Sequence, residues 1–309
     1  CVNTIPFYMF YSMFGFQRIG DQAWACGDSR CRGFLIGCTA GRTTLAGEGL
    51  QHQDGHSLLT ASTIPNLLSY DPAFGYEISV IVKDGIDRMY RQREPVFYYI
   101  TVENEPYPQP PKPEDVDEGI LRGIYRVRRA EAAADQPRVH LFGSGAILRE
   151  AMAAQEMLSE RFGVAADVWS VTSYTQLRRN ALACERWNLL HPGESPRVPY
   201  IQQVLQDQPY PIVATSDYMK AVADQISRWV PAGWVSLGTD GFGRSESRAR
   251  LREYFEVDAR FVTLAALREL ARTGQFDSSK LGAAVQDLNI DPEKSDPVGV
   301  PVSDTLQED

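Results

Sequence analysis

The sequence predicts an α/β protein of two units, the second of which holds a mostly parallel sheet. Short segments rich in β-branched and aromatic residues alternate with segments whose apolar residues recur every three or four positions. Strands separated by helices need crossover connections, and these favour a parallel sheet covered on both faces. The length of 309 residues is enough for about two domains.

The first unit is expected to span residues 1–105. Residues 5–10 predict a buried strand, and residues 33–36 are a short apolar segment before a loop rich in glycine and threonine. Residues 76–82 fit either a helix or a strand. Residues 96–102 (VFYYITV) are dense in β-branched and aromatic residues, which predicts a strand.

A proline-rich stretch at residues 106–113 is predicted to be a semi-rigid linker, because proline interrupts both helices and central strands. The second unit is expected over residues 114–290. The remaining residues, 291–309, form a polar tail that contains proline and is predicted to be disordered.

Four short apolar segments predict the strands of the second unit, at residues 139–142, 168–171, 212–215 and 234–237. After the first of them, a turn at residues 143–145 precedes apolar residues at helical spacing, namely Ile147, Ala151, Ala154, Leu158 and Phe162. A further helix is predicted from about Asp217.

Composition and charge exclude several classes of protein. The net charge of −9 is opposite to the basic footprint of a nucleic-acid-binding protein. No apolar run approaches the roughly 20 residues that span a bilayer, so no membrane partner is expected. The five cysteines are odd in number and show no C-x-x-C spacing, which argues against a disulfide framework or a zinc site and favours a reducing cytoplasm. The start at Cys1 indicates processing or a piece of a longer chain.

Two glycine motifs resemble nucleotide-binding loops but depart from them. In residues 37–43 (GCTAGRT) the glycines enclose three residues where a P-loop has four, and Arg42 stands where lysine is required. The turn at residues 143–145 lacks the third glycine of a dinucleotide fingerprint, since Leu148 occupies that place. Tight loop geometry and close strand–helix packing are the favoured interpretations.

His52 and His56 lie four residues apart in a loop rich in glycine. A zinc site of the H-E-x-x-H kind needs glutamate directly after the first histidine and a helix, whereas Gln53 follows here. A loop histidine can bind or protonate a substrate, or it can be structural, and the residues leave both open. The aromatic run nearby (Tyr8, Phe10, Tyr11, Phe14, Phe16) predicts core packing for most of its members, while one ring could face a heterocycle.

These segments carry a resemblance to the homodimeric bacterial pyruvate dehydrogenases, which decarboxylate pyruvate with thiamine diphosphate. It rests on IPFYMFYSMFGFQRIGD (5–21), RGFLIG (32–37), GRTTL (41–45), GEGLQH (47–52), CERWNLLHP (184–192), PRVPY (196–200) and GTDGFGRS (238–245). The resemblance covers nearly the whole chain and corresponds to the carboxy-terminal portion of that family.

The resemblance implies a transketolase-like fold, with part of the pyrimidine-binding domain followed by the carboxy-terminal domain. It implies that the diphosphate, the Mg²⁺ ligands and the glutamate that activates the aminopyrimidine lie in an amino-terminal portion outside this chain. No metal ligand is therefore assigned here. By the same reasoning, the 309 residues alone are expected to be inactive.

Three site residues follow from the resemblance. Phe14 matches the aromatic residue that packs on the pyrimidine ring, and Tyr11 matches a tyrosine that lines the site. His52 matches the histidine that contacts the substrate-derived intermediate, and His56 is given no role.

The implied activity is decarboxylation of pyruvate and reductive acetylation of the lipoyl group of dihydrolipoyl acetyltransferase, in a cytoplasmic homodimer within the pyruvate dehydrogenase complex. The alternatives are another thiamine-diphosphate enzyme of the transketolase or 2-oxo-acid dehydrogenase group, or a fragment that acts only in dimerisation and complex docking.

Overall fold

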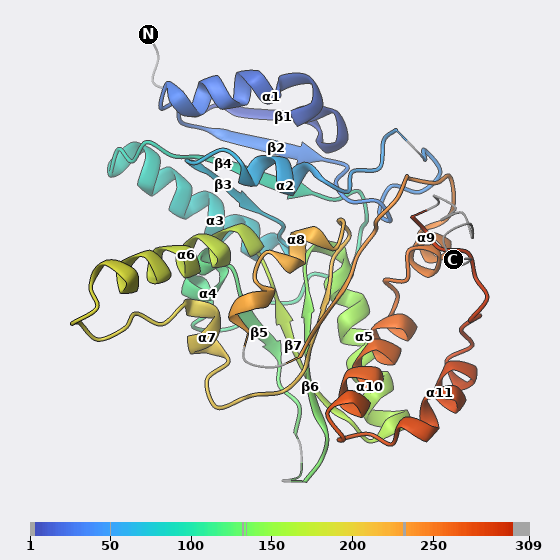
Figure 1. The fold of residues 1–309 in the computed structure, drawn as a ribbon. Helices are drawn as coiled ribbons and strands as arrows, with labels where there is room; N and C mark the ends of the chain where they lie inside the picture. Colours follow the sequence, from blue (N-terminus) through green and yellow to red (C-terminus); the bar gives the residue numbers. More distant parts are fainter. Residues whose placement is uncertain (1–3, 50, 132, 134, 231–232, 299–309) are drawn as a thin grey trace, which may run out of the picture.

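A computed structural model describes residues 4–49, 51–131, 133, 135–230 and 233–298. The chain forms two sheets, one of four strands and one of five, with helices packed around each (Figure 1). The first sheet is built from residues before the proline-rich stretch and the second from residues after it. The predicted α/β class with a mostly parallel second sheet is confirmed.

The first sheet has the strand order β1-β2-β4-β3, and all its pairs are parallel. Its strands are β1 (Phe7–Tyr11), β2 (Phe34–Cys38), β3 (Leu67–Tyr70) and β4 (Phe97–Val102). The strand predicted at 96–102 is confirmed, and β3 was not predicted. The expectation of a buried strand at 5–10 is wrong in one respect. β1 lies at the edge of the sheet and most of its side chains are uncovered, with Met9 70% exposed.

Three helices accompany this sheet: α1 (Ser12–Asp28), α2 (Ser57–Ser62) and α3 (Gly75–Ile86). The segment 76–82, which fitted helix or strand, is helical. Glu77 explains where α3 begins, because its carboxylate accepts hydrogen bonds from the backbone N–H groups of Ala73 and Phe74 at 2.5 and 3.0 Å. These bonds satisfy donors that a helix start leaves free.

The second sheet has the order β5-β7-β6-β8-β9, in which only the β5–β7 pair is antiparallel. Its strands are β5 (Tyr125–Arg128), β6 (Arg138–Gly143), β7 (Ala165–Ser170), β8 (Ile212–Thr215) and β9 (Trp234–Leu237). Four of the five match predicted segments to within a few residues. The exception is β5, whose four residues include two arginines and give no apolar signal.

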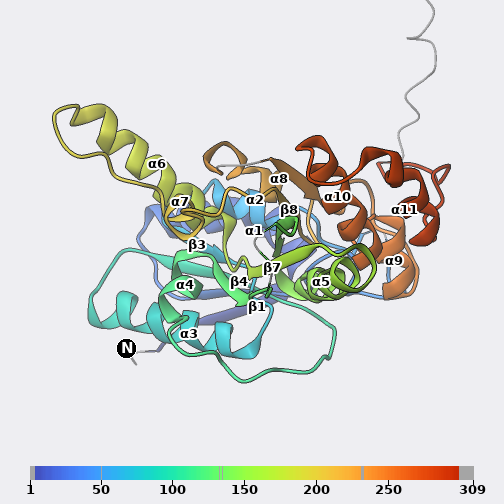
Figure 2. The same ribbon diagram turned by 90° about the horizontal axis from the view of Figure 1, so that it is seen from below.

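The helices of the second unit surround this sheet. They are α4 (Asp117–Arg122), α5 (Leu148–Phe162), α6 (Tyr174–Leu190), α7 (Tyr200–Val204), α8 (Ala221–Asp224), α9 (Arg248–Tyr254), α10 (Ala259–Arg272) and α11 (Leu281–Asp287). α5 and α10 pack on each other and on the central strands, whereas the end of α6 projects from the body of the fold (Figures 1 and 2). The helix predicted from about Asp217 begins four residues later, at Ala221.

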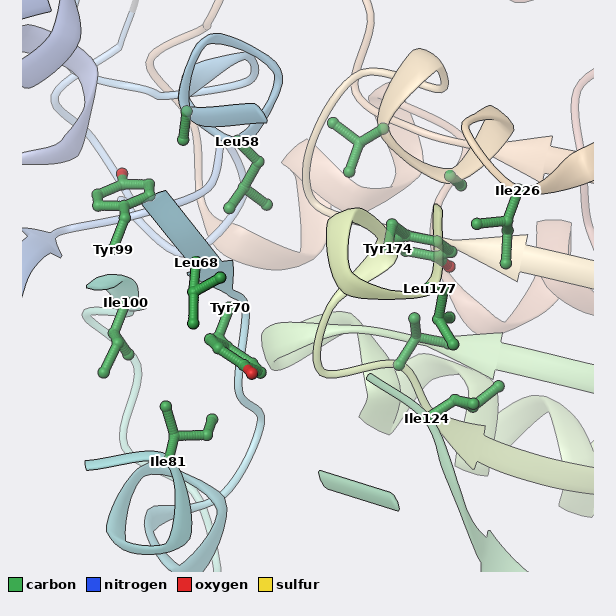
Figure 3. Close-up of a cluster of buried hydrophobic side chains, with 14 of the residues drawn as sticks. Leu58, Leu68, Tyr70, Ile81, Tyr99, Ile100, Ile124, Tyr174, Leu177 and Ile226 are labelled. Carbon is green, nitrogen blue, oxygen red and sulfur yellow. The ribbon is translucent and has the colours of Figure 1, made fainter. Parts of the chain in front are cut away.

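A common apolar core joins the two units. Side chains from the first sheet and α3, among them Tyr70 and Ile81, face Ile124, Tyr174 and Leu177 of the second unit (Figure 3). The Tyr70 hydroxyl also donates a hydrogen bond of 2.9 Å to the carbonyl of Leu121 across this boundary.

The proline-rich stretch 106–113 contains neither helix nor strand, as expected of a linker. It is not detached from the body, because the ring of Tyr107 lies under the guanidinium of Arg149 at 4.3 Å. The division into units at 106–113 remains a prediction.

The tail predicted at 291–309 is described only as far as residue 298. Residues 291–298 contain neither helix nor strand. Lys294 holds them against α9, since its ammonium donates to the carbonyl of Tyr254 at 3.0 Å and to Glu256 at 2.8 Å. Residues 299–309 lie outside the described part of the chain. Within that part, no helix combines the length and apolarity needed to cross a bilayer.

Candidate active site

The structure brings together the three residues singled out from the sequence. The rings of Tyr11 and Phe14 have centroids 6.0 Å apart, and the imidazole of His52 lies 6.0 Å from Tyr11 and 5.2 Å from Phe14. Both contacts with His52 are edge-to-face, at interplanar angles of 67° and 75°. Edge-to-face packing is a favoured arrangement of aromatic rings.

Sheet topology explains this meeting. Tyr11 is the last residue of β1 and Phe14 lies in the first turn of α1. β1 and β2 run parallel with Tyr11 beside Cys38, so the loop that follows β2 and carries His52 leaves the sheet at the same edge. The carboxyl edge of a parallel sheet is the usual place for a ligand site in open α/β folds.

The aromatic run that supplies two of these rings is less buried than its composition suggested. Phe16 is buried at 6% exposure, whereas Tyr8 and Tyr11 are 54% and 44% exposed. The expectation that most of the run packs in the core is therefore wrong. The run spans the start of α1 and the edge strand β1, four of whose five residues are exposed.

His52 has polar and apolar neighbours on different sides. Its Nε2 atom lies 3.9 Å from a carboxylate oxygen of Glu48, four residues earlier. Its Nδ1 atom is buried and has no hydrogen-bond partner among the residues that the structure describes. A buried polar atom without a partner is costly, which is a reason to expect a ligand or water beside it.

A hollow of about 190 Å³ lies beside the aromatic pair. It is lined by Tyr8, Phe10, Tyr11, Phe14, Gly15, Arg18 and Ile19. The guanidinium of Arg18 lies 4.4 Å from the centroid of the Phe14 ring, over its face. Because Arg18 is exposed, a flat ligand could replace it on that face.

Larger hollows lie elsewhere. One of about 400 Å³ is lined by residues of α9, α10 and the segment 289–295, and one of about 710 Å³ lies between α3 and α4. Neither touches Tyr11, Phe14 or His52. The chemistry at the 190 Å³ hollow, and not its size, makes it the candidate site.

The loop that carries His52 is anchored to the second unit. The amide of Gln53, which is fully buried, donates to the carbonyl of Arg244 at 3.0 Å and accepts from its N–H at 2.7 Å. Gly49 lies against Ser245 so closely that a Cβ atom there would be 2.3 Å from the serine hydroxyl. The second unit thus fixes the position of a histidine that belongs to the first.

His56 lies apart from the aromatic pair. Its Nε2 atom is 3.0 Å from the side-chain amide of Gln17, and its backbone N–H donates to Asp54 at 3.0 Å, just before α2. The two histidines therefore do not form a metal pair. No group of three or more histidine, cysteine or acidic side chains in the described residues is arranged to hold a metal ion.

Sequence reasoning missed Arg18 and Glu48 as neighbours of the site. A spacing of four residues separates Phe14 from Arg18 and Glu48 from His52. Only the first pair could have been recognised, because residues four apart meet on a helix and α1 contains both.

Sequence reasoning also missed a seam of carboxyl groups behind the loop, formed by the buried Asp71 and Asp217 and the partly buried Glu103. Asp71 follows β3, Glu103 follows β4 and Asp217 lies just after β8, so carboxyl ends of strands from both sheets meet here. Glu103 accepts from the N–H of Ala146 at 2.7 Å, and Asp217 accepts from the N–H of Thr43 at 3.0 Å. Each of these bonds crosses between the units.

Burial disfavours the charged form of these acids. It raises the pKa of Asp217 to about 7 and that of Asp71 to about 6. The pKa of Glu103 is raised well above its ordinary range, first by burial and then by Asp71. The acids of the seam therefore keep their protons to a higher pH than exposed carboxyl groups do.

The glycine motifs have the structural roles favoured for them. Gly41 has a φ of +80°, in the left-handed region that suits glycine, and a Cβ atom there would lie 2.2 Å from Asp217 Oδ2. At Gly143, a Cβ atom would lie 2.6 Å from the Cα atom of Leu148, so glycine allows the helix to approach β6.

Both units of the chain resemble domains of known proteins. Residues 1–110 match the model of the pyruvate dehydrogenase E1 component middle domain, and residues 123–258 match that of the transketolase-like C-terminal domain. Over 295 residues, 95% of the chain, it is 55% identical to the pyruvate dehydrogenase E1 component of Escherichia coli K12. The chain is therefore similar to pyruvate dehydrogenase E1 components across both of its units. The E1 component of Pseudomonas aeruginosa is 54% identical over the same share, and the chain spans about a third, 33%, of either relative's length.

Solved transketolases share the fold. A transketolase mutant of Pichia stipitis aligns with a TM-score of 0.66 at 18% identity, over 88% of this chain and 35% of that one. The transketolase of Leishmania mexicana aligns at 0.64 and 16% identity, over 87% and 34%. The inactive β4 tetramer of a split-gene transketolase aligns at 0.59 and 17% identity, over 87% of this chain and 76% of that chain. The transketolase-like fold is thus confirmed.

Proposed function

We propose that this chain is part of a thiamine-diphosphate-dependent pyruvate dehydrogenase, which decarboxylates pyruvate and reductively acetylates the lipoyl group of dihydrolipoyl acetyltransferase. The observation that carries the proposal is the meeting of Tyr11, Phe14 and His52 at the carboxyl edge of the first sheet, in a chain 55% identical to an E1 component. Tyr11 and Phe14 come from one segment, and His52 comes from a separate loop about 40 residues further along the chain.

The site fits the flat aminopyrimidine of the cofactor. Phe14 offers an aromatic face beside a hollow, and the surface residue Arg18 that covers it can move away. Phe14 would hold the ring by stacking, and Tyr11 would line the same wall. Thiamine diphosphate, when bound, supplies the electron sink that 2-oxo-acid decarboxylation requires. The Mg²⁺ and diphosphate ligands are proposed to belong to the amino-terminal portion of the enzyme.

His52 is proposed to act on the substrate. Its unpartnered Nδ1 atom can form a hydrogen bond with a polar group of the substrate, and a carboxylate oxygen of Glu48 lies 3.9 Å from its Nε2 atom. An imidazole N–H that donates to a carbonyl or carboxylate oxygen stabilises negative charge that develops there. The loop contacts through Gln53 hold this ring in place before substrate arrives.

Partners are proposed on the same basis. Phe7, Tyr8 and Met9 of β1 are 48–70% exposed next to the site although they alternate between the two faces of the strand, and the strand has a free edge. Exposed apolar patches of this kind mark interaction surfaces. We infer that the rest of the enzyme and a second subunit of a homodimer cover it. The four described cysteines are free, which supports a cytoplasmic setting.

Substrate choice tests the proposal. The longer enzyme that contains this chain should release carbon dioxide from pyruvate in the presence of thiamine diphosphate and Mg²⁺, and should acetylate a lipoyl domain. The 309 residues alone are expected to release none, since the chain spans a third of its relatives' length. Activity with ketose phosphates in place of pyruvate would indicate a transketolase. Binding to the acyltransferase without turnover by the longer enzyme would indicate a docking module.

A further inference from the structure

Two cysteines meet where α1 ends. Arg30 has a φ of +56°, and its N–H donates to the carbonyl of Gly27 at 3.0 Å, while the N–H of Cys31 donates to the carbonyl of Cys26 at 2.9 Å. This pair of bonds defines a Schellman motif, which is frequently accompanied by a side-chain contact between the positions of Cys26 and Cys31, and the two thiols here interact through a side-chain hydrogen bond. Backbone geometry, and not chance proximity, therefore places the two thiols side by side.

The two thiols differ in accessibility. Cys31 is exposed and Cys26 is partly buried, and neither is in a disulfide. Burial raises the pKa of Cys26 to about 11, and the adjacent Cys31 thiol adds to the rise. An exposed thiol next to a second, more protected one is the arrangement of a reactive cysteine and its resolving partner.

The other described cysteines are not placed to compete. Cys38 ends β2, so the whole length of that strand separates it from Cys31, which precedes the strand. Cys184 is buried on α6 in the second unit. Within the described part of the chain, Cys26 is the thiol that the backbone brings to Cys31.

We propose that Cys26 and Cys31 form a reversible disulfide when the enzyme meets a peroxide. The Cys31 thiolate attacks one peroxide oxygen, the O–O bond breaks, and hydroxide leaves to give a sulfenic acid. The Cys26 sulfur then attacks the Cys31 sulfur, the S–O bond breaks, and water leaves with the Cys26 proton. In total, two thiols lose two electrons and two protons, and one hydrogen peroxide becomes two waters.

The disulfide would lock the end of α1. Its formation ties residue 26 of the helix to residue 31 just before β2, and the intervening turn also receives a hydrogen bond from Asn66 to the carbonyl of Gly27 at 2.9 Å. Since α1 carries Phe14 at its other end, oxidation changes the rigidity of the helix that bears the proposed stacking residue.

Peptide mapping after peroxide treatment tests this proposal. The full chain is exposed to hydrogen peroxide, the remaining thiols are alkylated, and trypsin cuts after Arg18, Arg30 and Arg32. We expect peptide 19–30 joined to peptide 31–32, with the loss of two hydrogen masses, and complete separation after dithiothreitol. Cys31 found as a sulfinic or sulfonic acid in the unaltered protein, or linked to any cysteine other than Cys26, would overturn the proposal.

Matched variants sharpen the result. In Cys26→Ser, the linked species should be lost completely, and Cys31 should accumulate as higher oxyacids, because its resolving partner is gone. Cys38→Ser should leave the yield of the linked species unchanged. Full resistance of Cys31 to peroxide in both the unaltered protein and Cys26→Ser would contradict the proposal as well.

Discussion

Replacing Asp217 by asparagine should remove part of the pH dependence of the free energy of unfolding. Asp217 is fully buried, and burial raises the pKa of its carboxyl from an ordinary 3.8 to about 7. The folded protein therefore binds a proton on this group that the unfolded chain has already released near neutral pH. Asparagine keeps the size of the side chain and one acceptor for the N–H of Thr43, and it does not titrate.

The sign and size follow from linkage between folding and proton binding. Because the pKa is raised on folding, the contribution of Asp217 to stability is fully present below about pH 4 and is lost as the pH rises through 7. A difference of about three in pKa corresponds to about 4 kcal/mol in the free energy of unfolding. Between about pH 5 and pH 8.5, the contribution of Asp217 to the free energy of unfolding falls by about 3 kcal/mol.

Urea denaturation at these two pH values measures the effect. The free energy of unfolding of Asp217→Asn, relative to that of the unaltered protein, should be about 3 kcal/mol larger at the higher pH than at the lower one. Asp21→Asn, on an exposed position of α1, controls for the loss of one carboxylate. A stability difference for Asp217→Asn that is the same at both pH values would refute the reasoning.

Three further predictions follow from the fold and the site. Phe14→Ala should weaken thiamine diphosphate binding in the longer enzyme by about 0.5–1.5 kcal/mol in isothermal titration calorimetry, whereas the exposed Leu189→Ala should leave it unchanged. Proteinase K should cut within 106–113 before it cuts the buried strand at 96–102, and mass spectrometry of early fragments would reveal the opposite order. Leu177→Ala should lower the free energy of unfolding by about 2–5 kcal/mol, and Leu189→Ala on the same helix by less than about 0.5 kcal/mol.

Much of the fold was predictable because its strands are short apolar runs. β4, β6, β8 and β9 are dense in apolar and β-branched residues, and their sequences carry that signal. β5 escaped detection because its sequence, YRVR, places charged residues on an edge strand.

Burial in the first strand was mispredicted for a physical reason. The residues of β1 are as apolar as those of a central strand, and composition alone cannot distinguish an edge strand that has an exposed face from a central one. Exposed apolar side chains such as those of β1 are typical of a surface that binds another segment or chain.

The site was predictable only through resemblance. Physical reasoning left His52 between a substrate-binding and a structural role, because the contact with Phe14 depends on how β1 and β2 align. The seam of Asp71, Glu103 and Asp217 had a local signal, since each acid closely follows a strand. Its closeness to the loop of His52 depends on how the two sheets pack, which no local pattern encodes.

The paired substitutions His52→Ala and His56→Ala in the longer enzyme test the central claim most directly. Both histidines belong to the same loop region, but only His52 contacts the aromatic pair. The measurements are the rate of pyruvate decarboxylation and the dissociation constant for thiamine diphosphate. If His52 acts on the substrate, His52→Ala should lower the rate by on the order of 10²–10³ while cofactor affinity stays nearly unchanged. His56→Ala should have a smaller effect on the rate. Equal effects of the two substitutions, or a loss of rate in His52→Ala that more cofactor restores, would contradict the account.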